Sequence, residues 1–140
     1  MQKKVLVVDD DKEMLEAIQV NLETEGYIVQ TSVNGDCFQH LDGALPDLIL
    51  LDIVFPGEDG RDICRQLKQR EETRDIPIVL YSAHFSGDII SYLSGASTFL
   101  AKPFEMHDLI AITARYTTSA QSHAPSLPDK AALSESVKEE

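Results

Sequence analysis

The sequence predicts an α/β protein built on a parallel five-stranded sheet with helices on both faces. Five short apolar runs alternate with segments whose apolar residues recur at helical spacing, all within residues 1–116. Connections of this length require parallel strands joined by helical crossovers, which cover both faces of the sheet. A hydrophobic fraction of 43% in 140 residues is enough for one core, so we expect a single domain.

The expected strands are short and rich in aliphatic residues. The runs at 5–8, 48–51 and 78–81 are wholly apolar, which is typical of strands buried on both faces. The run at 28–33 is more polar, as suits an edge strand, and the run at 98–101 is the last of the five. Helical spacing follows each strand in turn, over residues 14–22, 37–41, 63–67, 89–93 and 109–116.

The composition changes after residue 116. Residues 117–140 contain five serines, two prolines and no aromatic residue, so they cannot bury much surface. We therefore assign residues 1–116 to the folded domain and expect residues 117–140 to form a flexible tail or linker. We expect a free-standing protein, and the alternative is that the tail begins a linker to a C-terminal effector domain.

Charge and composition exclude several classes of protein. There are 24 acidic and 12 basic side chains, and the net charge of −12 argues against direct binding of nucleic acid. No apolar run approaches the roughly 20 residues needed to span a bilayer, and the N-terminus does not have the pattern of a signal peptide. Cys37 and Cys64 lack the spacing of a metal site, which favours reduced thiols in a cytoplasmic protein.

Chemically active side chains follow four of the five expected strands. Asp9 and Asp10 follow the first strand, Asp52 the third, Ser82 the fourth and Lys102 the fifth. The carboxyl ends of parallel strands meet at one edge of a sheet, so these side chains should converge. Clustered carboxylates need a hard cation, Mg²⁺ or Mn²⁺, and a lysine with a hydroxyl suits a phosphoryl anion beside it. The set predicts a phosphoryl site in which one aspartate is the nucleophile.

These residues lie within longer motifs. In chain order the motifs are Val7-Val8-Asp9-Asp10, the segment 47–60, Tyr81-Ser82-Ala83, Gly95-Ala96 and the segment 99–104. With them the sequence resembles the CheY-like receiver domains of bacterial two-component response regulators over about residues 3–116. The resemblance implies a flavodoxin-like, doubly wound sheet with strand order 2-1-3-4-5.

The resemblance also implies a role for each acidic residue. Asp52 would accept a phosphoryl group from a histidine kinase or a phosphotransfer protein. Asp10 would bind the metal directly, Asp9 would act on it through a water molecule, and Val54 would contribute its backbone carbonyl. Asp11 is better suited to cap the first helix.

The remaining residues of the resemblance belong to a switch. Lys102 and Ser82 would bind the phosphoryl oxygens, and Pro103 would follow a cis peptide bond. Phosphorylation adds roughly −1.5 to −2 of charge and three acceptor oxygens. Ser82 would move toward these oxygens, Phe99 would turn into the vacated space, and a protein-interaction surface would change. The chain would then be a signalling phosphoacceptor rather than an enzyme.

Two features depart from the resembled pattern. The stretch between Ser82 and Lys102 is shorter than is usual, so we expect a short or irregular helix over residues 86–94. Val54 and His84 lie where they could influence water access to the aspartyl phosphate. An apolar Val54 cannot orient a hydrolytic water, so we expect slow self-dephosphorylation.

The expected partners are a phosphodonor protein and a downstream protein. We expect no contact with a membrane, and a phosphorylation-dependent homodimer is left open.

One alternative is a haloacid-dehalogenase-like phosphatase, because Asp9 and Asp11 resemble the start of that family. That family needs an acidic residue where this chain has Ser82. A flavodoxin is disfavoured because the acids after the first strand would repel the FMN phosphate. A receiver that acts only as a scaffold is disfavoured because every site position is filled.

Overall fold

The computed structural model describes residues 2–41, 45–82 and 94–118. The predicted irregular helix over residues 86–94, apart from Ser94, lies outside the described residues, as do His84 and residues 119–140. Among the helices in the described ranges, none is long and apolar enough to cross a membrane.

A five-stranded parallel sheet forms the centre of the molecule. Its strand order is β2-β1-β3-β6-β7, which is the predicted order 2-1-3-4-5 counted along the chain. All five predicted strands are present, and the edge strand β2 ends at Ser32, one residue earlier than expected. Their bounds are β1 Lys4–Val8, β2 Ile28–Ser32, β3 Leu48–Asp52, β6 Ile78–Ser82 and β7 Thr98–Ala101.

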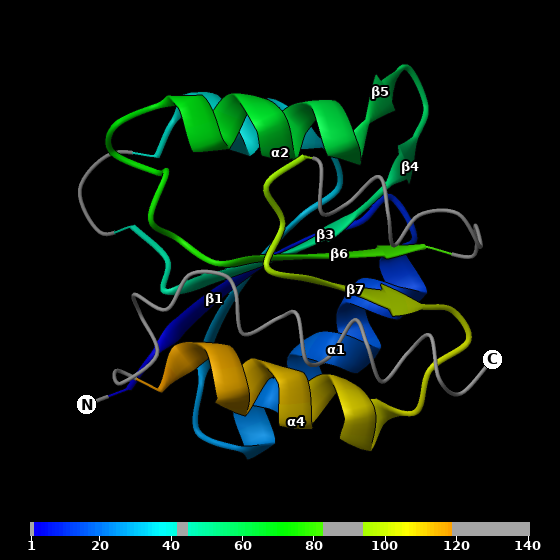
Figure 1. Cartoon of the computed structure of the whole chain (residues 1–140). Helices are drawn as coiled ribbons and strands as arrows, with labels where there is room; N and C mark the ends of the chain where they lie inside the picture. Colours follow the sequence, from blue (N-terminus) through cyan, green and yellow to red (C-terminus); the bar gives the residue numbers. More distant parts are fainter. Residues whose placement is uncertain (1, 42–44, 83–93, 119–140) are drawn as a thin grey trace, which may run out of the picture.

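Helices cover both faces of this sheet, which confirms the doubly wound class. The helix α2 (Gly60–Gln69) and the short 3-10 helix η1 (Gly35–Gln39) lie on one face, above the sheet in Figure 1. The helices α1 (Lys12–Thr24) and α4 (Met106–Thr117) lie together on the other face. The last helix therefore ends one residue beyond the predicted domain boundary.

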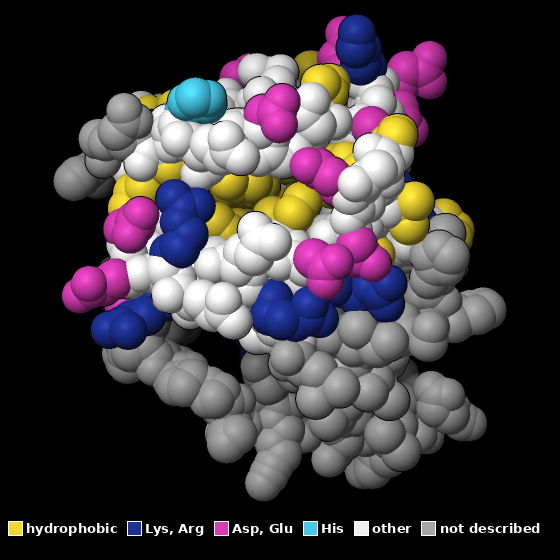
Figure 2. All heavy atoms as spheres, turned by 90° about the horizontal axis from the view of Figure 1, so that it is seen from above, with side chains coloured by type: hydrophobic (Ala, Val, Ile, Leu, Met, Phe, Trp, Pro, Cys, Tyr) yellow, Lys and Arg dark blue, Asp and Glu magenta, His cyan; other side chains and the backbone are white. Residues whose placement is uncertain are grey.

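Two hydrophobic cores follow from the alternation of side chains along the strands. Even-numbered residues of β1 and β6 face α2, and odd-numbered residues of the same strands face α1 and α4. β3 and β6 are buried at every position, and apolar side chains precede the polar residue that ends each strand, because both faces pack against a helical layer. On the face that η1 and α2 cover, apolar side chains remain visible between polar ones in Figure 2.

The connection between β3 and α2 contains regular structure that the sequence analysis did not identify. Strands β4 (Val54–Phe55) and β5 (Glu58–Asp59) form a small antiparallel hairpin there. The turn between them holds Gly57 at a φ of 78°, which glycine adopts without strain. Glu58 Oε1 accepts a hydrogen bond of 3.1 Å from the Gly35 N–H, so the hairpin also anchors the start of η1.

Candidate functional site

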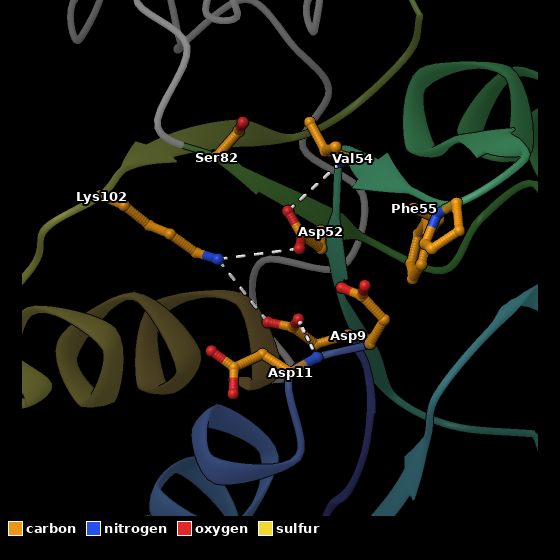
Figure 3. Close-up of a pocket in the computed structure, with 9 residues that line it drawn as sticks. Asp9, Asp11, Asp52, Val54, Phe55, Ser82 and Lys102 are labelled. Carbon is orange, nitrogen blue, oxygen red and sulfur yellow. Dashed lines mark hydrogen bonds and ion pairs between the residues drawn. The ribbon is translucent and has the colours of Figure 1, made fainter.

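Three carboxylates meet at the carboxyl edge of the sheet. Asp9 directly follows β1 and is fully buried, and Asp52 is the last residue of β3 and is almost fully buried. Asp10 is exposed, and one oxygen from each of the three lies within 4.8 Å of the others. They share a cleft of about 550 Å³ with residues from four other places in the chain, namely Asp11, the stretch Val54 to Pro56, Ser82 and Lys102. Figure 3 shows the side chains of Asp9, Asp52 and Lys102 turned toward one another in this cleft.

Lys102 supplies the positive charge of the cleft. Its Nζ lies 3.7 Å from Asp52 Oδ2 and 3.8 Å from Asp9 Oδ2 (Figure 3). Both distances exceed the roughly 2.7–2.9 Å of a direct charge-assisted hydrogen bond. The ammonium therefore lies between two carboxylates without a direct hydrogen bond to either. Its backbone N–H donates to the Ser82 carbonyl at 2.9 Å, which fixes where the lysine leaves β7.

The carboxyl group of Asp52 has a raised pKa. Burial and the neighbouring Asp9 raise it from the ordinary 3.8 to about 6, although Lys102 opposes the shift. A buried carboxylate beside another carboxylate is costly to ionise. A cation in the cleft would lower this cost and favour the ionised form.

Asp9 is held by two donors that the sequence analysis did not identify. The Tyr81 hydroxyl donates to Asp9 Oδ2 at 2.7 Å, and the Asp11 N–H donates to Asp9 Oδ1 at 2.9 Å. Burial, followed by Asp9 and Asp52, raises the pKa of Tyr81 well above its usual range, so its hydroxyl keeps its proton. The sequence did contain a signal for the Tyr81 bond, namely a tyrosine in the apolar run at 78–81. A buried tyrosine hydroxyl usually has a hydrogen-bond partner, so one could have been expected here.

Asp11 is the cap of α1, as predicted. Its Oδ1 accepts hydrogen bonds from the N–H groups of Glu13 at 3.0 Å and Met14 at 3.2 Å. These bonds satisfy two of the donors left open at the start of a helix. Asp11 borders the cleft, but one of its carboxylate oxygens is already committed to the helix.

Val54 and Ser82 lie at the cleft, as the sequence analysis expected. The Val54 side chain is 49% exposed at its rim, and its N–H lies 3.4 Å from Asp52 Oδ1. Ser82 is buried at the end of β6 and lines the cleft. An apolar, accessible side chain thus stands beside the central carboxylate.

Phe99 and Pro103 lie further from the carboxylates. Phe99, on β7, is partly buried and packs against the hydrophobic core beneath α2, where it pairs in register with Leu80. The Lys102–Pro103 peptide bond is cis, as expected. Beyond it, the Phe104 ring packs edge-on against Tyr81 with centroids 5.9 Å apart.

Gly60 allows the start of α2 to lie against the end of β3. Its N–H donates to the Ile53 carbonyl at 2.7 Å. A Cβ at this position would collide with the Asp52 carbonyl oxygen and the Ile53 backbone. Only glycine permits this close approach, which fixes the backbone that carries Asp52.

The donor set fits a hard divalent cation. Carboxylate oxygens are the ligands that Mg²⁺ and Mn²⁺ prefer, and Mg²⁺ usually binds one or two carboxylates while keeping several waters. Asp10 is accessible, the cleft is open to solvent, and Val54 lines it.

A doubly wound sheet with acids and a lysine at its carboxyl edge defines a class of α/β domains that handle phosphoryl groups beside a metal ion. The family model described as the response regulator receiver domain matches residues 5–114, so the chain belongs to that family. Receiver domains are signalling phosphoacceptors that bind Mg²⁺ at an acidic pocket, and this chain carries an aspartate cluster at the corresponding edge.

Known proteins of this family resemble the chain along most of its length. It is 38% identical over 111 residues to the DNA-binding dual master transcriptional regulator RpaA of Synechocystis sp., which covers 77% of the chain and 46% of RpaA. It is 37% identical over 114 residues to the phosphate regulon transcriptional regulatory protein PhoB of Rhizobium meliloti, covering 79% of the chain and 50% of PhoB. The chain therefore spans about half the length of these curated relatives.

A solved structure shows the same architecture. The signal receiver domain of a signal transduction histidine kinase from Syntrophus aciditrophicus superposes with a TM-score of 0.77 at 30% sequence identity. The match covers 89% of this chain and 96% of that one. The resemblance predicted from the motifs is therefore confirmed at the level of family and fold.

Proposed function

We propose that Asp52 is the phosphoacceptor of this receiver domain. The observation that supports this most is that its carboxylate shares one cleft with Asp9 and Asp10 and lies 3.7 Å from the Lys102 ammonium. A carboxylate oxygen of Asp52 forms a bond to phosphorus, and the bond from phosphorus to the donor's nitrogen or oxygen breaks. The donor keeps the electron pair of that bond and takes up a proton from solvent.

The other residues would hold the cation. Asp10 would bind Mg²⁺, or Mn²⁺, directly, Asp9 would act on it through a water molecule, and Asp52 and the Val54 carbonyl would complete the protein ligands. A cation held there would supply positive charge to offset the charge of the phosphoryl group. Lys102 also supplies positive charge to the phosphoryl group, because its ammonium lies 3.7 Å from Asp52 Oδ2.

Phosphorylation then changes a surface that binds other proteins. The new phosphoryl oxygens attract the Ser82 hydroxyl, and Phe99 changes its packing on the adjacent strand. The phosphodonor is a histidine kinase or a phosphotransfer protein, and a second copy of the phosphorylated chain is a candidate partner. The free thiols Cys37 and Cys64 agree with a cytoplasmic location, which we also propose.

Val54 would make the phosphorylated state long-lived. Its exposed apolar side chain stands at the rim of the cleft and offers no group to orient an attacking water. His84, the other predicted modulator, lies outside the described residues. Loss of the phosphoryl group within seconds from wild-type protein would contradict this proposal.

The test is labelling by a small phosphodonor such as acetyl phosphate, in the presence and absence of Mg²⁺. Wild-type protein should gain one phosphoryl group only when Mg²⁺ is present, and Asp52→Asn should gain none. Asp62→Asn is the matched control, because Asp62 is an exposed acid that pairs with Arg65 on α2. Undiminished labelling of Asp52→Asn would overturn the proposal.

A further inference from the structure

Tyr81 is a buried phenol whose position is fixed on all sides. It lies on β6 with no exposed surface, in the core between the sheet and the helices α1 and α4. The Phe104 ring meets its edge at an interplanar angle of 78°. In this position the Tyr81 hydroxyl is directed at Asp9, in the proposed phosphorylation site.

The hydroxyl completes the hydrogen bonding of Asp9. It donates to Asp9 Oδ2 at 2.7 Å, while the backbone N–H of Asp11 donates to Asp9 Oδ1 at 2.9 Å. With a donor on each oxygen, the buried carboxylate cannot rotate without losing a bond to a charged group. Tyr81 therefore orients Asp9 from inside the core.

The oxygen that Tyr81 binds is also the Asp9 oxygen nearest Lys102. The ammonium lies 3.8 Å from Asp9 Oδ2 and 3.7 Å from Asp52 Oδ2, and it lies 5.1 Å from the centre of the Tyr81 ring. The ring attracts the cation, while the hydroxyl partly satisfies the charge of Asp9. Both effects oppose a direct ion pair between Lys102 and Asp9.

We propose that Tyr81 is a positioning residue of the phosphorylation site. Its hydroxyl holds Asp9 and prevents Lys102 from forming a direct ion pair with that carboxylate. The ammonium therefore stays available to the phosphoryl group on Asp52. This inference rests on the proposed function. Without the hydroxyl, the buried Asp9 Oδ2 would lose the donor that lies 2.7 Å from it. Lys102 would then move onto Asp9 and away from the phosphoryl group.

The first experiment measures the rate of phosphorylation by acetyl phosphate at saturating Mg²⁺ and saturating phosphodonor. Tyr81→Phe keeps the ring, its packing and its contact with the lysine, and we expect the maximal rate to fall roughly tenfold. The matched control is Tyr27→Phe, which removes a hydroxyl 3.3 Å from Thr117 Oγ1, outside the residues lining the cleft, and should leave the rate unchanged. A wild-type rate for Tyr81→Phe, with Asp52→Asn still unlabelled, would overturn this inference and leave the proposed function standing.

The second experiment tests whether Tyr81 acts through Lys102. In a Lys102→Met background the lysine can no longer close onto Asp9, so adding Tyr81→Phe should change the remaining rate less than twofold. An equal loss in both backgrounds would overturn the inference. Replacing Tyr81 with p-aminophenylalanine, which keeps a donor, should restore the rate, whereas p-methylphenylalanine, which fills the space without donating, should not. This pair separates hydrogen bonding from packing if Tyr81→Phe proves unstable.

Discussion

At the scale of single residues, the site brings together carboxylates that repel one another in the absence of a ligand. Asp9 and Asp52 are both buried, and in the part of the chain that the structure describes Lys102 is the one lysine paired with them. The cost appears in the raised pKa of Asp52, whose largest causes are burial and then the charge of Asp9. An acidic residue held this way is destabilising at neutral pH until a cation or a phosphoryl-metal pair neutralises the cleft.

Asp52→Asn should therefore stabilise the metal-free protein in a pH-dependent way. The folded-state pKa of about 6 lies above the ordinary 3.8, so the folded state binds the proton more tightly and loses stability as pH rises through 6. At neutral pH the variant should be more stable than wild type by roughly 3 kcal/mol, because the pKa is raised from 3.8 to about 6 and one pKa unit corresponds to about 1.4 kcal/mol. The difference should shrink below pH 6 and nearly vanish near pH 4.

Urea unfolding in the presence of a chelator, at neutral pH and near pH 4, measures this difference. The same substitution at the exposed Asp62 should have little effect at either pH. A variant that is less stable than wild type at neutral pH would show that Asp52 is not strained in the folded state.

At the scale of elements, the sequence was informative wherever a segment is long or uniform enough to show a period. The five strands and the α1 cap could be predicted because aliphatic runs and a capping residue are local signals. The β4–β5 hairpin could not, because two-residue strands have no period. The Tyr81–Asp9 bond joins residues 72 positions apart, so only the fold reveals it.

The cap of α1 gives a prediction that separates structure from chemistry at Asp11. Asp11→Ala removes two hydrogen bonds to the helix N-terminus and should lower the free energy of unfolding by about 1 kcal/mol. The Mg²⁺ concentration needed for half-maximal phosphorylation should change little, because Asp10 rather than Asp11 belongs to the metal cluster. Asp11→Ser, which can also cap, should recover the stability. Loss of Mg²⁺-dependent phosphorylation in a folded Asp11→Ala protein would assign the residue to the metal site.

At the scale of the whole molecule, most of the net charge of −12 does not belong to the site. On the face shown in Figure 2, Asp and Glu side chains are interspersed with Lys and Arg side chains. Only Asp9, Asp10 and Asp52 form a cluster within metal-binding distance among the described residues. The proposed metal requirement would therefore arise from these three residues and not from the charge of the molecule as a whole.

Mg²⁺ should consequently stabilise the whole fold. A ligand that binds only the folded state adds about 2.7 kcal/mol at a concentration one hundred times its dissociation constant. Thermal unfolding with increasing Mg²⁺ should show a rising midpoint for wild type and a much smaller rise for Asp10→Asn. Asp62→Asn should respond like wild type, since Asp62 lies on α2 in an ion pair with Arg65. Equal responses of wild type and Asp10→Asn would place the cation elsewhere.

The most direct measurement is to locate the phosphoryl group on the chain. Borohydride reduces an aspartyl phosphate to homoserine, so wild-type protein phosphorylated in Mg²⁺ can be reduced, digested and sequenced by mass spectrometry. We expect homoserine at position 52, in the peptide that carries the end of β3, and at neither Asp9 nor Asp10. Homoserine at position 9 would instead indicate a nucleophile after β1, and its absence from position 52 would contradict the proposal that Asp52 is the phosphoacceptor.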